Sequence, residues 1–204
     1  MFIDRLIESI TEKRNPSVVG LDTLLGYVPR SIREKHAARL ADPAAAAAEA
    51  IFEFNARIID RVCDIVPAVK PQLAYFELYG PSGAECFRKT ADYARAKGLL
   101  VIADAKRNDI GSTATAYADA YLGETELGGG EAMRALGAGA MDASPKPGGG
   151  DAMRAYAADA MTVNPYLGAD GVEPFLKNCD KYGKGIFVLV KTSNPSSGQL
   201  QDLE

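Results

Sequence analysis

The chain has 204 residues, of which 47% are apolar and 25% are charged, and its net charge at pH 7 is −4. These values suit one substantial hydrophobic core and argue against nucleic-acid binding, which needs a concentrated basic surface. No apolar run approaches the roughly 20 residues that cross a bilayer, and the amphipathic, acid-bearing N-terminus does not resemble a signal peptide. We therefore expect a cytoplasmic protein that binds neither membranes nor nucleic acid.

Residues that bind metals or build catalytic triads are scarce. His36 is the only histidine, and the three cysteines are widely spaced with no CxxC pair. This pattern predicts a reducing compartment without a disulfide framework, and no metal site. Proton transfer would then fall to Lys, Asp, Glu, Tyr or Cys side chains.

The N-terminal third of the chain begins with apolar residues at helical spacing over residues 2–13, and Asn15-Pro16 follows as a stop signal. The segment 17–22 (SVVGLD) predicts a short buried strand that ends in an acid, and a polar connection follows it. Asp42 and Pro43 form an N-cap and a first-turn proline, so they predict the start of a long helix.

Four more strands are predicted along the rest of the chain, at 66–72 (VPAVKPQ), 99–106 (LLVIADAK), 160–166 (AMTVNPY) and 185–193 (GIFVLVKTS). Helices are expected between them. One opens at a capping box of Ser82 and Glu85 and ends near Lys97-Gly98, one covers Thr113–Leu122, and one starts at Asp170.

This alternation of strands and helices predicts a parallel sheet covered by helices. Two architectures compete, an open doubly wound sheet and a closed TIM (β/α)8 barrel. The first strand is not followed by a GxGxxG or P-loop motif, and each predicted strand ends in polar residues, which favours the barrel. A whole barrel takes roughly 250 residues, so we predict an incomplete α/β barrel of about five strands, forming a single partial domain over residues 1–204.

Residues 128–147 and 148–167 look like a tandem duplication, because 11 of their 20 aligned positions are identical. The second copy contains the predicted strand at TVNPY. We therefore interpret the first copy, 128–147, as an inserted loop with a short helical turn. Glycine triplets open both copies and are interpreted as linkers.

The stretch DAKRNDIGSTA (104–114) places charges where a strand ends. Residues two apart in a strand share a face, so Asp104 and Lys106 should both point into the barrel mouth. Lys70 ends the neighbouring strand and Asp109 follows in the loop, which gives an alternating Lys-Asp-Lys-Asp set. Any one of these residues alone is compatible with a structural ion pair, whereas their conjunction predicts a preorganised catalytic field.

The motif D-x-K-x-x-D-I-x-x-T closely resembles that of orotidine 5'-phosphate decarboxylase, in particular its longer bacterial branch. The resemblance extends to VVGLD, VPAVKPQLAYFE, TVNPYLG and GIFVLVKTSNP, and covers nearly the whole chain apart from the insert. It implies decarboxylation of orotidine 5'-monophosphate to uridine 5'-monophosphate in pyrimidine biosynthesis. It also implies a reaction without a metal, flavin or nicotinamide cofactor.

By the same resemblance, Lys70, Asp104, Lys106 and Asp109 would be the catalytic tetrad, with Lys106 protonating C6 of the pyrimidine. Asp104 would lie beside the carboxylate of the substrate. The expected substrate-binding residues are Asp22, Thr113, Asn164 and Ser193, although Asn164 fits a turn-forming Asn-Pro at least as well. The resemblance implies a homodimer in which Asp109 and Thr113 reach the site of the partner.

Two other readings remain open at this point. One is a related sugar-phosphate enzyme of the same superfamily, which would need a carboxylate metal ligand, usually a Glu, where this chain has Asp22 or Lys70. The other is an inactive remnant, because the family's phosphate-binding loop and Arg would follow later strands than those predicted here. On this ground we expect a chain truncated at the C-terminus, with poor or no activity by itself.

Overall fold

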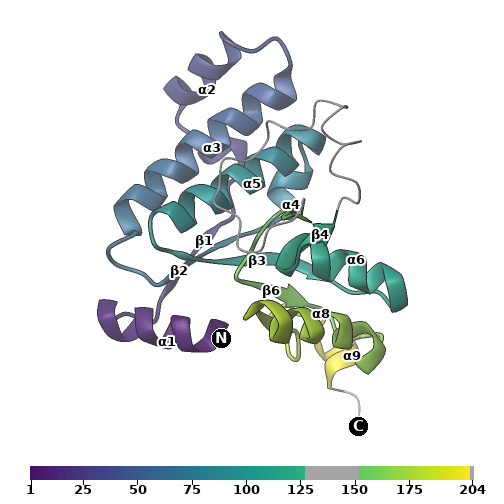
Figure 1. Ribbon diagram of the computed structural model, residues 1–204. Helices are drawn as coiled ribbons and strands as arrows, with labels where there is room; N and C mark the ends of the chain where they lie inside the picture. The colour runs from purple at the N-terminus through teal and green to yellow at the C-terminus, as the bar shows by residue number, and fades with distance from the viewer. Residues whose placement is uncertain (127–151, 203–204) are drawn as a thin grey trace.

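The computed structural model describes residues 1–126 and 152–202 (Figure 1). The predicted insert at 128–147 lies outside the described residues. The strands are β1 (Val18–Leu21), β2 (Ala68–Pro71), β3 (Leu100–Arg107), β4 (Thr125–Glu126), β5 (Ala152–Met153), β6 (Ala160–Val163) and β7 (Gly185–Val188). The helices are α1 (Phe2–Lys13), η1 (Leu25–Tyr27), α2 (Arg30–Ala37), α3 (Pro43–Val62), α4 (Ala74–Glu77), α5 (Gly80–Ala96), α6 (Gly111–Leu122), α8 (Ala169–Tyr182) and α9 (Gly198–Gln201).

Five of these strands form one sheet in the order β1-β2-β3-β6-β7, and every neighbouring pair is parallel. The spatial order is therefore the chain order of these five strands, without a reversal. A doubly wound sheet reverses its order at a switch point, whereas a barrel adds each strand beside the previous one. The five predicted strands and the incomplete barrel are thus confirmed, and the doubly wound alternative is wrong. The first strand is not buried as expected, because only Leu21 of β1 is buried and Val18 is 40% exposed.

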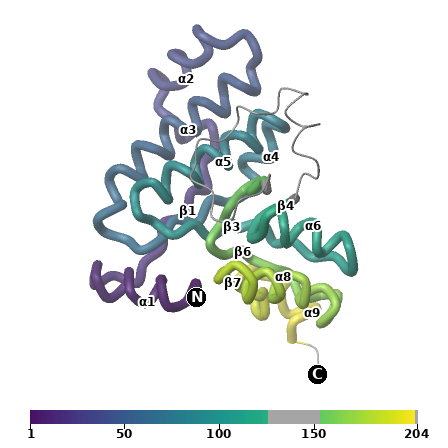
Figure 2. Tube along the Cα trace, in the orientation of Figure 1, coloured from purple at the N-terminus to yellow at the C-terminus, as the bar shows by residue number. Residues whose placement is uncertain are grey.

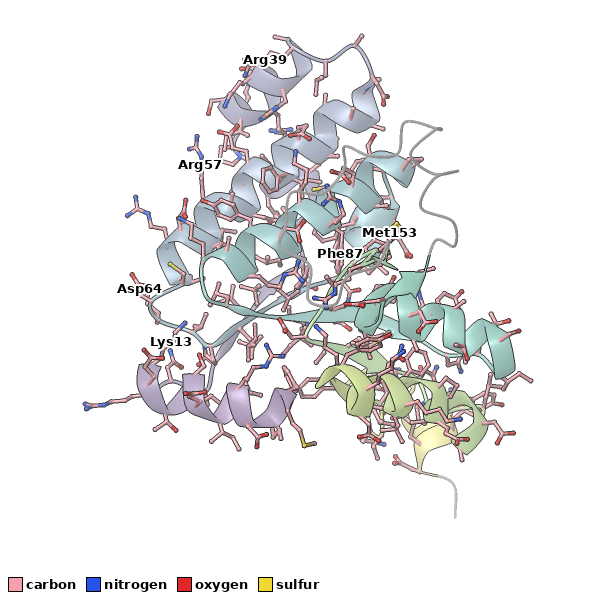
Figure 3. All side chains as sticks on the ribbon, in the orientation of Figure 1. Lys13, Arg39, Arg57, Asp64, Phe87 and Met153 are labelled. Carbon is pink, nitrogen blue, oxygen red and sulfur yellow. The ribbon has the colours of Figure 1, made fainter. Side chains whose placement is uncertain are left out.

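The helices α3, α5, α6 and α8 follow these strands around the outer side of the sheet (Figure 1). Phe87 of α5 is fully buried in the layer between, where it packs with Phe76 and with Ala103 of β3 (Figure 3). Small alanines on the strand let the aromatic rings of the helices approach closely. The largest hydrophobic cluster therefore lies outside the sheet and leaves its inner face to other residues.

The inner face is apolar at the amino ends of the strands. Phe2 of α1 packs there against Leu100, Ile102 and Ala160, and its ring meets Phe187 of β7 edge-on at 6.1 Å between centroids. Figure 2 shows the same closeness of the N-terminal helix to β7. At its other end α1 is held by Lys13, whose ammonium donates to the carbonyls of Cys63 and Val66 near Asp64 (Figure 3). Helix α1 thus covers the amino ends of the strands, and the carboxyl ends remain free.

Local structure differs from the expectations at three points, two of them wrong predictions and one a helix that was not predicted. Helix α5 starts at Gly80, before the expected capping box, because Gly80 adopts φ +56° and Pro81 fits the first turn, while Glu85 pairs with Arg88 instead. The polar connection after β1 contains the helix α2. Strand β7 ends at Val188, short of the expected limit at 193.

Candidate active site

The carboxylate of Asp104 is the centre of a charged cluster at the carboxyl edge of the sheet. Its side chain is only 7% exposed and accepts four hydrogen bonds. Oδ2 accepts from the ammonium of Lys70 at 2.6 Å and from Nε2 of Gln72 at 2.8 Å. Oδ1 accepts from the ammonium of Lys106 at 2.5 Å and from Oγ1 of Thr162 at 2.9 Å. Two cations therefore flank one buried anion, with neutral donors beside them.

Three adjacent strands bring these groups together. Lys70 lies on β2 and Gln72 directly follows that strand, where it forms a single parallel bridge with Asp104 of β3. Thr162 lies on β6, on the other side of β3. Because parallel strands end at the same edge of a sheet, side chains distant in sequence converge there.

Strand β3 is irregular at Lys106. The pairing of β3 with β6 shifts between Ala103 and Arg107, and Lys106 has a φ of +48°. A non-glycine residue in this left-handed region is uncommon and costs about 1–2 kcal/mol. The backbone N–H of Lys106 donates to Oγ1 of Thr162 at 3.0 Å, so the irregular turn is held by the same hydroxyl that touches Asp104.

The surroundings of Asp104 keep it ionised. Burial by itself would raise the pKa of this carboxyl, but the hydrogen bonds from Lys106, Lys70 and Thr162 outweigh burial, and the pKa lies below its ordinary value. A charged carboxylate between two ammonium groups is a fixed field that needs no reorganisation when a substrate binds. Such a site suits a reaction in which a negative charge develops beside Lys106.

The fourth predicted member of the tetrad is not part of this cluster. Asp109 lies in the loop before α6, and its carboxylate accepts the backbone N–H of Ile110 at 2.9 Å. Ile110 and Thr113 beside it are exposed to solvent. Within this chain the structure therefore joins Lys70, Asp104 and Lys106, and leaves Asp109 and Thr113 on an exposed loop and helix start.

The remaining predicted binding residues lie at or beyond strand ends. Asp22 follows β1, is exposed, and makes no hydrogen bond within the described residues. Oδ1 of Asn164 accepts the backbone N–H of Tyr166 at 3.0 Å, which is the turn geometry that the sequence left as its alternative. Ser193 is exposed, five residues past the end of β7. The binding roles of these three residues stay predictions.

Gln72 and Thr162 were missed by the sequence analysis, although both contact Asp104. Gln72 carries the only available signal, since it lies two residues after Lys70 and so shares its strand face. The sequence gives no such signal for Thr162, because a β-branched residue in a strand is already expected on grounds of packing.

The chain matches the model of the orotidine 5'-phosphate decarboxylase / HUMPS family over residues 47–150 and 150–204. The chain belongs to this family. The resemblance carried by the motif at 104–114 is thereby confirmed. Similar proteins include the orotidine 5'-phosphate decarboxylases of Rhodopirellula baltica (44% identity) and Caldicellulosiruptor saccharolyticus (43% identity), both matched over 202 residues and 99% of this chain.

These family relatives are longer than this chain, which spans 58% and 59% of their lengths. Among solved structures, OMP decarboxylase of Leishmania donovani is 32% identical, with a TM-score of 0.62 over 100% of this chain and 58% of that one. Orotidine 5'-monophosphate decarboxylase of Plasmodium berghei is 19% identical, with a TM-score of 0.69 over 98% of this chain and 64% of that one, and supports the fold alone.

In the part of the chain that the structure describes, no helix is long and apolar enough to cross a membrane.

Proposed function

We propose that the cluster around Asp104 decarboxylates orotidine 5'-monophosphate to uridine 5'-monophosphate, a step of pyrimidine biosynthesis. One observation carries the proposal: a buried, ionised carboxylate lies between the ammonium groups of Lys70 and Lys106 at 2.6 and 2.5 Å. Membership of the decarboxylase family supports the reaction class.

In this proposal, Lys106 is the proton donor. Its ammonium is half-exposed at the carboxyl edge, so a bound pyrimidine can reach it, while Asp104 beneath it is covered. As carbon dioxide leaves, the electron pair of the broken C–C bond stays on C6 of the ring. Lys106 stabilises this carbanion and then transfers a proton to it. Asp104 lies near the departing carboxylate and disfavours the ground state by like-charge repulsion.

The other predicted residues bind the nucleotide. Lys70 and Asp22 lie at the ends of adjacent strands, where they suit the ribose hydroxyl groups, and Ser193 is assigned to the pyrimidine ring. We further propose a homodimer in which Asp109 and Thr113 enter the site of the partner. Asp109 is partly exposed on the loop before α6 and Thr113 is exposed in the first turn of that helix, which is compatible with this role.

A second candidate is a non-catalytic remnant that binds ligands or oligomerises. It is favoured by the open end of the sheet at β7, which has no further strand beside it within the described residues. Phe187 there is 42% exposed and Val190 is 80% exposed. A site that is open on this side lacks the enclosure that strengthens electrostatic catalysis.

Turnover distinguishes the two candidates. The chain is incubated with orotidine 5'-monophosphate, and release of carbon dioxide and formation of uridine 5'-monophosphate are measured together. We expect slow but measurable turnover, equal in the wild type and in Lys177→Ala, a control at an exposed lysine of α8 that pairs with Glu173. We expect no turnover by Lys106→Ala, because this variant lacks the proton donor.

Retained turnover in Lys106→Ala would remove this residue from the role of proton donor. A folded wild type without any turnover would overturn the proposed decarboxylase and favour the remnant.

A further inference from the structure

Thr162 makes two hydrogen bonds that join separate parts of β3. Its hydroxyl donates to Oδ1 of Asp104 at 2.9 Å and accepts the backbone N–H of Lys106 at 3.0 Å. The residue is 9% exposed, so water competes little for these bonds. A threonine hydroxyl has a single hydrogen to donate, and Asp104 takes it.

The pairing of β3 with β6 explains why the hydroxyl is needed. Ala103 pairs with Met161 and Arg107 pairs with Val163, so three residues of β3 lie opposite the single residue Thr162. At such a bulge the ladder is interrupted and extra residues lose their backbone partners. The hydroxyl of Thr162 replaces the missing acceptor for Lys106, which is the residue with a φ of +48°.

Packing alone does not account for a threonine here. Its neighbours on β6 are buried and apolar, namely Ala160, Met161 and Val163. Valine has the same shape and the same preference for strands, and would avoid the cost of burying a hydroxyl. The polar atom is therefore explained by the two groups that it contacts.

We propose that Thr162 is a positioning residue, whose hydroxyl fixes the backbone of Lys106 relative to the carboxylate of Asp104. It thereby holds the ammonium of Lys106 on one side of that carboxylate. The proposal rests on the proposed function in one respect, namely that Asp104 and Lys106 are the groups that act on the substrate. The positioning itself is a property of the chain without substrate and is tested in that state.

The first test measures two signals by NMR, the amide hydrogen exchange of Lys106 and the pH titration of the Asp104 carboxyl carbon, assigned with Asp104→Asn. In Thr162→Val we expect loss of protection at the Lys106 amide and an upward shift of the Asp104 midpoint by about one pH unit, because one hydrogen bond to the charged form is lost. Thr162→Ser keeps the hydroxyl and should restore both signals.

A matched control is Thr90→Val. Thr90 is likewise a buried threonine, fully inaccessible to solvent, and donates a hydrogen bond, but to the carbonyl of Cys86 within α5. It should leave both signals as in the wild type. Thr162→Ala provides a smaller variant without the hydroxyl in case valine prevents folding, and the same changes are expected for it.

Wild-type values of both signals in Thr162→Val or Thr162→Ala, with folding verified by circular dichroism, would overturn the proposal. So would a Lys106 amide that exchanges at the random-coil rate in the folded wild type, which tests the proposal even if neither variant folds. Both readouts are independent of turnover, so a wild type without decarboxylase activity would contradict the proposed function and leave this test intact. With activity present, kcat should fall at least tenfold in Thr162→Val with a smaller change in KM, and Thr162→Ser should recover it.

Discussion

The buried carboxylate of Asp104 is stabilised by the hydrogen-bond donors around it. An uncompensated carboxylate at this depth would become protonated or destabilise the fold, but four donors surround it here, two of them cationic. The cost of burial is thereby offset, and the carboxylate is fixed in position between Lys70 and Lys106.

The lowered pKa of Asp104 predicts a pH dependence of stability. A carboxyl whose pKa is lower in the folded than in the unfolded state contributes stability that is fully present above the unfolded value, near pH 4. That stability is lost as the pH falls through the folded value. We therefore expect the free energy of unfolding of the wild type to exceed that of Asp104→Asn by a constant amount above about pH 5, and by less with further acidification.

Urea unfolding of both proteins between pH 6 and pH 2.5 measures this difference. A difference that stays constant or grows on acidification would contradict the assignment. Taking the difference between the two proteins removes the contribution of other paired carboxyls, such as Glu53, whose pKa is lowered to about 2 by hydrogen bonds from Lys35 and His36.

For single residues, the sequence predicted the site where the two-residue period of a strand determines which side chains share a face. The two-residue spacing of Asp104 and Lys106 in an apolar strand implied a shared face, and the order of the strands placed Lys70 beside them. The role of Thr162 could not be predicted, because it depends on a bulge in β3 that no local sequence pattern indicates. The close contact at Gly20 could not be predicted from the sequence either. A Cβ at this position would lie 2.6 Å from Oδ2 of Asp22.

Among the secondary-structure elements, helices α4 and α5 pack especially closely against each other. Gly83 of α5 lies against the carbonyl of Phe76 in α4, where a Cβ would lie 1.7 Å from the oxygen. The absence of a side chain at this position therefore permits the contact between the two helices, and Phe76 and Phe87 then meet edge-on at 5.4 Å between ring centroids.

Gly83→Ala should consequently destabilise the fold. Alanine is favoured over glycine in a helix by about 1 kcal/mol, but the backbone clash forces the helices apart and costs about 1–3 kcal/mol or more, so the clash should win. The free energy of unfolding measured in urea should fall. Gly26→Ala is the matched control, since no heavy atom lies within 4 Å of a Cβ at that position, and its unfolding should be nearly unchanged. Equal stability of both variants would show that α4 and α5 are not in close contact.

Capping and turn residues predicted some elements and not others. Asp42 caps α3 as expected, accepting the backbone N–H groups of Ala44 and Ala45. The capping box at Ser82 and Glu85 was wrong, because Gly80 and Pro81 let the helix begin earlier. Helix α2 was missed because Ile32 is its only buried residue, so its apolar stripe is too narrow to be recognised.

Across the whole molecule, the two ends of the parallel strands differ. Phe2 of α1 covers the amino ends of the strands, whereas the carboxyl ends carry the charged cluster. Strand order was foreseeable only indirectly, from polar residues at each strand end, because periodicity predicts strands and not their neighbours. The predicted dimer contacts of Asp109 and Thr113 stay a prediction, since a single chain does not contain the partner.

The central claim is that the cluster of Lys70, Asp104 and Lys106 is where a pyrimidine nucleotide binds and reacts. Calorimetric titration with 6-hydroxyuridine 5'-monophosphate, a mimic of the carbanion at C6, tests this claim most directly. We predict binding by the wild type and by Lys177→Ala with equal affinity, and about 10- to 100-fold weaker binding by Lys106→Ala, because a charge-assisted hydrogen bond is lost. Equal affinity in Lys106→Ala, or no binding by the folded wild type, would contradict the claim.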